Sequence, residues 1–125
     1  MNLIDSSGWL HCLLNGPLVE RYLPFLSRPR EVLTPTIVMY EVYKKIRREG
    51  NEELAHVAAG AMGETNIVEL TPELAYLAAD FSTTHKLSLA DAVIYATAQT
   101  REAKLVTSDA DLKDLPGVTF FPLEE

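Results

Sequence analysis

The chain has 125 residues, of which 47% are hydrophobic, and this is enough to bury the core of one domain without disulfide or metal cross-links. Its formal net charge of −7 argues against a protein that coats nucleic acid through bulk electrostatics, because attraction to phosphates dominates that kind of binding. We therefore expect a single domain over residues 1–125.

The N-terminal part of the chain predicts two strands separated by two helices. A short apolar run at residues 2–4 predicts the first strand. Ser6 or Ser7 is expected to cap the first helix, and Pro17 is expected to open the second helix near its first turn. A second strand is predicted at residues 31–34.

The middle of the chain repeats this alternation. Thr36 precedes a third predicted helix, and Gly50 is expected to end it. A fourth helix is predicted over residues 52–62, and a third strand over residues 66–69. The sequence Thr-Pro-Glu at residues 71–73 is typical of the start of a helix and predicts the fifth.

The C-terminal part begins with a helix that is apolar on nearly every side. This sixth helix is predicted from Ser88 to about Arg101, and it should be largely buried. Strands are predicted at residues 104–107 and 118–121. Since strands alternate with helices along the chain, we expect a three-layer α/β/α sandwich with a central, mostly parallel five-stranded sheet.

Four acidic residues fall where such a sheet binds ligands. Asp5 follows the first strand directly, and Asp109 lies two residues beyond Thr107, the end of the fourth strand. Glu41 lies in the early turns of the third helix, and Asp91 lies in the first turn of the sixth. Open parallel sheets bind ligands at the carboxyl ends of their strands, where the following helices begin. The four carboxylates are therefore predicted to meet in one pocket.

Each acid also has a purely structural interpretation. Asp91 fits a capping box with Ser88, and Asp109 suits a turn or a helix cap. Glu41 could be a solvated helix residue, and Asp5 could cap the first helix. The joint placement of all four at the ligand-binding edge favours a site over four separate structural roles.

Clustered carboxylates predict a site for a hard divalent cation. Like charges at close range repel unless a cation or protons compensate them. Mg²⁺ or Mn²⁺ bound by a few carboxylates and water can activate water and stabilise the oxygens of a phosphodiester under attack. Motifs for other chemistries are missing from the sequence: the three histidines are scattered, and there is no glycine-rich nucleotide loop and no GxSxG.

A basic cluster follows Glu41 on the third predicted helix. Lys44, Lys45 and Arg48 lie three, four and seven residues beyond Glu41 and therefore share its face. These side chains are candidates for contacts with RNA phosphates. The alternative is that they only complement the helix C-terminus and remain solvated.

The chain resembles PIN-domain ribonucleases, in particular VapC-type toxins of toxin–antitoxin pairs. The resemblance covers nearly the whole chain. It rests on four segments that follow one another at the expected intervals: LIDSS at residues 3–7, TPTIVMYEV at 34–42, LSLADA at 87–92 and LVTSDADL at 105–112.

The resemblance implies a Mg²⁺- or Mn²⁺-dependent endoribonuclease that forms a homodimer and is silenced by a cognate antitoxin protein. It also implies roles for individual residues. The metal ligands would be Asp5, Glu41, Asp91 and Asp109, with Asp111 as a second, less regular acid, and Ser6 or Ser7 and Thr107 would supply small hydroxyl groups near the site.

Two alternatives remain open from the sequence. A phosphoacceptor receiver domain has similar length and carries acids at the same edge, but it needs an acid pair after the first strand and a phosphorylated Asp after the third. The chain has Asp5-Ser6-Ser7 and Glu69-Leu70-Thr71 at those places. The second alternative is a non-catalytic binding module in which the acids serve only as caps.

The sequence also favours a cytoplasmic location. Cys12 is the only cysteine and cannot form an internal disulfide. The first residues lack the basic region of a signal peptide, and no apolar run approaches the roughly 18 residues of a membrane span. We therefore expect a reduced, cytoplasmic protein without a membrane partner.

Overall fold

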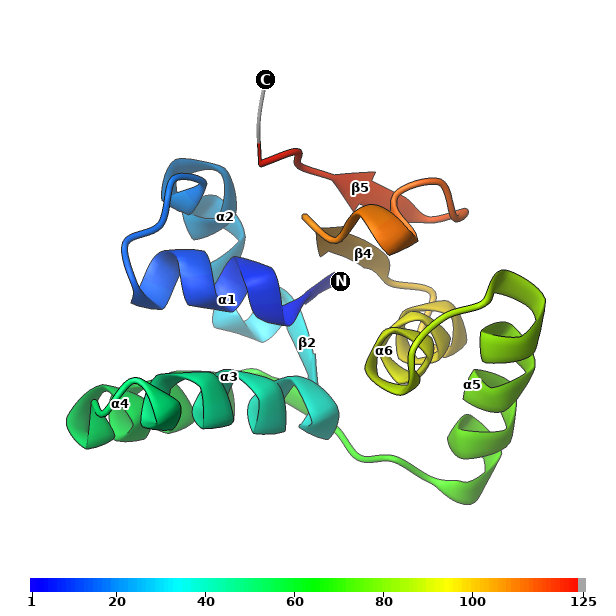
Figure 1. Cartoon of the computed structure of the whole chain (residues 1–125), viewed down its shortest axis with the longest axis horizontal. Coiled ribbons are helices and arrows are strands. Elements are labelled where there is room, and N and C mark those ends of the chain that lie inside the picture. The colour runs from blue at the N-terminus through cyan, green and yellow to red at the C-terminus, as the bar shows by residue number, and fades with distance from the viewer. Residues whose placement is uncertain (124–125) are drawn as a thin grey trace.

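The computed structural model describes residues 1–123, which form five strands and six α-helices (Figure 1). The strands are β1 (Asn2–Ile4), β2 (Val32–Pro35), β3 (Asn66–Val68), β4 (Lys104–Thr107) and β5 (Val118–Phe120). The helices are α1 (Ser6–Leu13), α2 (Val19–Leu26), α3 (Thr36–Arg48), α4 (Glu52–Gly63), α5 (Pro72–His85) and α6 (Leu89–Thr100). Two short 3-10 helices, η1 (Pro29–Glu31) and η2 (Ala110–Leu112), complete the described chain.

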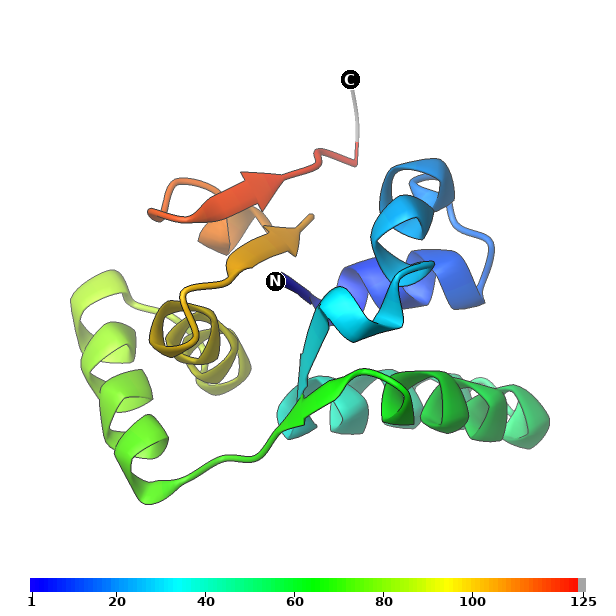
Figure 2. The same cartoon turned by 180° about the vertical axis from the view of Figure 1, so that it is seen from behind.

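The five strands form one parallel sheet in the order β3-β2-β1-β4-β5. The chain moves from β1 outward to β3 and then returns to β4 on the other side of β1. Because crossovers between parallel strands are right-handed, this reversal places the two sets of helices on opposite faces. Figures 1 and 2 show α1 to α4 on one side of the sheet and α5 and α6 on the other. The predicted parallel α/β/α architecture is confirmed.

The strand order also decides against a receiver domain. Receiver domains have the order 2-1-3-4-5, whereas this sheet has the order 3-2-1-4-5. The direction of the chain reverses between β1 and β4. In open α/β sheets the ligand crevice forms outside the carboxyl ends of the strands at this reversal. The fold therefore places its natural binding crevice beside the ends of β1 and β4.

The core is built around the two central strands. Leu3 and Ile4 of β1 and Leu105 and Val106 of β4 are fully buried. In helix α6 every residue from Asp91 to Ala98 is buried, as its apolar composition predicts. Among residues 1–123, none of the helices combines the length and the apolar character needed to cross a bilayer. The strands that lead to Asp5 and Asp109 are thus enclosed within the core.

The predicted starts of two helices were wrong. Helix α1 is capped by the carboxylate of Asp5, which accepts a hydrogen bond from the amide of Ser6, and not by Ser6 or Ser7. Helix α2 begins at Val19, so Pro17 lies in the preceding turn. The end of α3 is as predicted, because Gly50 follows it with a φ of 81°, a conformation that favours glycine. Strand boundaries differ from the predictions by one residue at most.

Candidate metal centre

A cleft of about 410 Å³ opens where the sheet reverses direction, beside the ends of β1 and β4. It brings together all four of the acids predicted to form a site, although they come from four distant segments of the chain. The cleft is lined by Asp5, Ser6, Ser7, Leu10, Tyr40, Glu41, Lys44, Lys45, Arg48, Asp91 and Asp109.

Asp5 is the most deeply buried acid of the cleft, with 4% of its surface exposed. Its backbone amide extends the pairing of β1 with β4 by donating to the carbonyl of Val106 at 3.1 Å. Its carboxylate accepts hydrogen bonds from the Ser6 amide at 2.7 Å and from Thr107 Oγ1 at 2.6 Å. Burial raises the pKa of Asp5, while the bonds from Thr107 and Ser6 oppose that rise. The side chain is therefore held rigidly in a place where its negative charge is costly.

Glu41 joins Asp5 through a shared hydroxyl. Ser6 Oγ lies 2.5 Å from Glu41 Oε1 and 3.2 Å from Asp5 Oδ1. Because a hydroxyl has a single proton to donate, Ser6 cannot satisfy both carboxylates fully. The early part of α3 and the end of β1 thus present two carboxylates that lack a full complement of donors.

Asp91, Asp109 and Asp111 form the other half of the acidic group. Each offers a carboxylate oxygen, and these oxygens lie within 4.8 Å of one another. The pKa of Asp91 is raised to about 7, first by burial, then by hydrogen bonding to and repulsion by Asp109, and finally by the charges of Asp5 and Glu41. Asp111 is exposed and does not line the cleft, but it belongs to this group.

The structural roles considered for these acids are real but incomplete. Asp5 caps α1, and Asp109 Oδ1 accepts from the amide of Asp111 at the start of η2. Ser88 Oγ accepts from the amide of Asp91 at 3.3 Å, which is one half of the predicted capping box. The carboxylate of Asp91 is directed toward Asp109 and Asp111. Capping therefore accounts for part of the geometry and leaves the crowding of the carboxylates unexplained.

The hydroxyl groups predicted near the site are all present there. Thr107 Oγ1 donates to Asp5 and accepts from the amide of Asp109 at 2.9 Å, so it links the two acids. Ser6 bridges Asp5 and Glu41 as described above. Ser7 lines the cleft, and its hydroxyl accepts from the amide of Ser108 at 3.4 Å.

Three basic side chains of α3 line the same cleft, as their spacing beyond Glu41 predicts: Lys44, Lys45 and Arg48. Lys45 forms an exposed ion pair with Glu49 at 3.3 Å. The nearby Arg47 is not part of the lining and pairs with Glu52 at 3.3 Å. The cleft therefore has an acidic end and a basic end.

Two lining residues were not predicted from the sequence. Tyr40 is exposed beside Glu41, and its hydroxyl accepts from Lys44 Nζ at 3.2 Å. Its spacing, one helical turn before Lys44, could have identified it. Leu10 lies one turn beyond Ser6 and Ser7 on α1, and its apolar side chain carried no chemical signal.

The donor set fits a hard divalent cation. Every acidic group in the lining is a carboxylate, and neither histidine nor cysteine occurs among the described lining residues. Mg²⁺ and Mn²⁺ favour oxygen ligands and retain bound water, which an open cleft with a few carboxylates allows. A cation would also relieve the repulsion that, in addition to burial, raises the pKa of Asp91.

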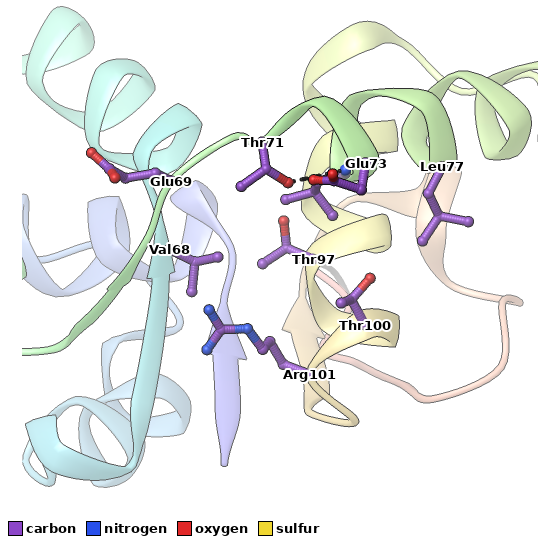
Figure 3. Close-up of a pocket in the computed structure, with 9 residues that line it drawn as sticks. Val68, Glu69, Thr71, Glu73, Leu77, Thr97, Thr100 and Arg101 are labelled. Atoms are coloured by element: carbon purple, nitrogen blue, oxygen red, sulfur yellow. Dashed lines mark hydrogen bonds between the residues drawn. The ribbon is translucent and has the colours of Figure 1, made fainter.

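A second cavity, of about 280 Å³, lies between the β3–α5 connection and α6 (Figure 3). Its walls include the apolar side chains of Val68, Leu74 and Leu77, and Arg101 points into it from the end of α6. Two glutamates lie at its rim, but the described residues form no group of three metal-binding side chains there. Among residues 1–123, the clustered acids therefore lie at the first cleft and not at this cavity.

Several solved structures share this fold. A toxin–antitoxin complex from Klebsiella pneumoniae is similar with a TM-score of 0.81 and 24% identity over 98% of this chain and 99% of that chain. FitAcB from Neisseria gonorrhoeae has a TM-score of 0.74 and 20% identity over 98% of each chain. The Sarcin-Ricin loop cleaving toxin VapC20 from Mycobacterium tuberculosis has a TM-score of 0.70 and 20% identity over 83% of this chain and 85% of that chain. At these identities the likeness shows the fold.

The sequence comparisons agree with the fold. No match is found among curated proteins. The family model of the PIN domain matches residues 3–118, a span that contains every acid of the cleft. This chain therefore belongs to the PIN domain family.

Proposed function

We propose that this chain is a Mg²⁺- or Mn²⁺-dependent endoribonuclease and the toxin of a toxin–antitoxin pair. The observation that carries the proposal is the convergence of Asp5, Glu41, Asp91 and Asp109 in one cleft at the carboxyl edge of the sheet. Membership of the PIN domain family supports it. So does the fold shared with VapC20, which is described as a toxin that cleaves the sarcin–ricin loop.

In this proposal the four acids are the metal ligands, with Asp111 as a further acid at the Asp91–Asp109 side. Thr107 and Ser6 hold the carboxylates of Asp5, Asp109 and Glu41 in place through the hydrogen bonds described above. When bound, a divalent cation would supply Lewis-acid stabilisation of the phosphodiester and acidify water for attack. The chain itself orients the ligands and places the basic end of the cleft next to them.

The basic end of the cleft is the proposed path of the RNA backbone. Lys44, Lys45 and Arg48 extend along α3 from Glu41, so phosphates that contact them would lead a neighbouring phosphodiester to the acids. The cations of Lys44 and Arg48 are not engaged in any ion pair within residues 1–123. They are therefore available to a substrate without the loss of an internal salt bridge.

Charge reversal of Lys44, Lys45 and Arg48 together should weaken RNA binding and flatten its dependence on salt. Each lost phosphate contact should reduce the slope of log K against log salt by about 0.7 for single-stranded RNA. Binding is measured at several salt concentrations with Ca²⁺ in place of Mg²⁺, so that cleavage is suppressed. The affinity for Mn²⁺ should be nearly unchanged.

Arg47 provides a matched control on the same helix. Arg48→Ala should reduce the salt slope, whereas Arg47→Ala removes an exposed ion pair outside the cleft and should not. Equal slopes for Arg47→Ala and Arg48→Ala would contradict RNA binding by the basic cluster and favour the alternative, in which these residues only complement the helix C-terminus and remain solvated.

The proposed partner is a cognate antitoxin protein, and the proposed assembly is a homodimer. Solved relatives of this fold include a toxin–antitoxin complex and VapBC and FitAB assemblies bound to DNA. The exposed side chain of Tyr40 lines the cleft beside Glu41, and the exposed side chain of Leu89 lies two positions before Asp91, so both could offer apolar contacts to a partner.

Expression of the chain alone should slow bacterial growth and degrade RNA, and co-expression of its antitoxin should restore growth. The physical reason is that an antitoxin bound over the cleft would exclude RNA. Growth curves are compared for the chain alone, the chain with a neighbouring candidate gene, and Asp5→Asn alone, which should be harmless. Unimpaired growth with abundant folded protein and intact RNA would remove the support for a toxin.

A further inference from the structure

Tyr22 lies outside the cleft yet is connected to it through a buried hydrogen bond. It belongs to α2 and has no exposed surface. Its hydroxyl oxygen is 2.7 Å from Oγ of Ser108, a residue 86 positions away in the sequence. Ser108 stands between Thr107, which donates to Asp5, and Asp109, which lines the cleft.

The ring of Tyr22 is fixed by close packing on three sides. A β-carbon at Gly8 would lie 2.5 Å from Cδ1 and Cε1 of the ring, so the ring rests directly on the backbone of α1. His11 stacks on it with a centroid distance of 5.9 Å, and Phe121 meets it edge-on at 5.3 Å. With the ring immobilised, the position of the hydroxyl is also set.

This hydroxyl completes the attachment of the segment that carries Asp109. The Thr107 side chain ties the segment to Asp5, and the Ser108 amide donates to Ser7 Oγ at 3.4 Å. The Ser108 side chain has Tyr22 as its partner. Burial raises the pKa of Tyr22, so its hydroxyl keeps its proton and can donate at neutral pH.

We propose that Tyr22 is a positioning residue for the metal centre, whose hydroxyl holds Ser108 so that the carboxylate of Asp109 stays in register with that of Asp5. This inference rests on the proposed function, because it assigns Tyr22 to the same site. Groups that hold ligands from outside the first coordination shell commonly affect metal affinity by about 10–100-fold. A purely structural tyrosine would affect the stability of the fold and leave metal affinity unchanged.

The test compares Tyr22→Phe with Tyr95→Phe. Tyr95 is a matched control, because it is also buried, also packs edge-on against a phenylalanine, and donates its hydroxyl proton to the carbonyl of Pro116 at 3.0 Å, away from the cleft. Mn²⁺ affinity is measured by calorimetric titration of the folded proteins, whose integrity is checked by thermal melts in chelator. We expect Tyr22→Phe to bind Mn²⁺ about tenfold more weakly and Tyr95→Phe to bind it like the parent.

Two further measurements sharpen the test. RNA cleavage by Tyr22→Phe should recover toward the parent rate as Mn²⁺ approaches saturation, measured at a temperature at which the melt in chelator shows the variant fully folded, because Mn²⁺ would also restore a partly unfolded protein by mass action. Ser108→Ala should weaken Mn²⁺ binding similarly, and the double variant should be no worse than either single variant, because both remove the same hydrogen bond.

The outcomes separate the two proposals. Parental Mn²⁺ affinity in a folded Tyr22→Phe protein would overturn the positioning role while leaving the nuclease intact. An equal weakening in Tyr95→Phe would do the same, since the effect would then reflect general loosening of the core. A parent chain that binds no Mn²⁺ and cleaves no RNA would overturn the proposed function, and the role of Tyr22 with it.

Discussion

Replacing Asp5 by asparagine should abolish RNA cleavage while leaving the metal-free protein at least as stable as the parent. Asn keeps the shape of the side chain but removes one charge and weakens one proposed ligand. Replacing a residue that only supports a metal ligand commonly costs about 10–100-fold in activity, so replacing the ligand itself should cost more. Without metal, the substitution should leave the free energy of unfolding unchanged or increase it. Burial raises the pKa of Asp5, which means that the fold favours an uncharged group at this position.

The metal response of Asp5→Asn should separate a ligand from a helix cap. An ion that binds only the folded protein stabilises it by mass action, so Mn²⁺ should raise the melting temperature of the parent more than that of Asp5→Asn. Asn caps helices about as well as Asp, so a purely structural Asp5 would leave the activity and the Mn²⁺ response intact. Asp80→Asn, at an exposed acid of α5, is the control and should behave like the parent in both assays. An active Asp5→Asn enzyme with an undiminished Mn²⁺ response would refute the four-carboxylate site.

In the absence of metal, the free energy of unfolding should fall as the pH rises from about 4 to about 7, and Mn²⁺ should reverse this trend. The pKa of Asp91 is raised from 3.8 to about 7 in the folded chain. Between these two values the folded state binds more protons than the unfolded state, so its stability decreases with rising pH. Asp5, whose pKa is also raised, acts in the same direction. With saturating Mn²⁺ the deprotonated carboxylates are the ones that bind, so stability should rise with pH over the same range.

The contribution of Asp91 is isolated by comparison with Asp91→Asn. His11 works against the trend, because burial lowers its pKa and this adds stability as the pH rises toward 6.5. That contribution is common to both proteins and cancels in the difference. Denaturant unfolding in chelator at several pH values should show the parent losing stability relative to Asp91→Asn as the pH increases. Parallel curves for the two proteins would contradict the proposed crowding of acids around Asp91.

The fold and the meeting of the acids could be predicted because both follow from local patterns and topology. Short apolar runs alternating with helical segments specify a parallel sheet, and the carboxyl ends of its strands necessarily share an edge. Asp5 and Asp109 are placed there by the ends of β1 and β4 alone. Glu41 follows because α3 begins directly after β2, at that same edge. Asp91 follows for another reason: α6 leads into β4, so it ends at the edge where β4 begins and starts at the opposite edge, where β4 ends.

The details that depend on side-chain packing could not be predicted. The contact of Tyr22 with Ser108 spans 86 positions, and no periodicity in the sequence connects them. The need for Gly8 becomes visible only when the ring of Tyr22 is seen on the backbone of α1. The cap of α1 was misassigned because Ser6 and Ser7 are good capping residues by type, whereas α1 already begins at Ser6, so that Asp5 occupies the cap position.

The most direct test of a metal-dependent ribonuclease is the cleavage of RNA by the purified chain with Mn²⁺ and with chelator, followed by mapping of the new ends. Asp5→Asn purified in the same way controls for contaminating nucleases. Water activated at a metal leaves linear phosphates, whereas attack by the ribose 2′-hydroxyl leaves 2′,3′-cyclic phosphates. We predict cleavage that requires Mn²⁺, yields linear phosphate ends and is lost in Asp5→Asn. Cleavage that persists in chelator with cyclic phosphate ends, or a folded parent that leaves RNA intact with Mn²⁺, would contradict the account.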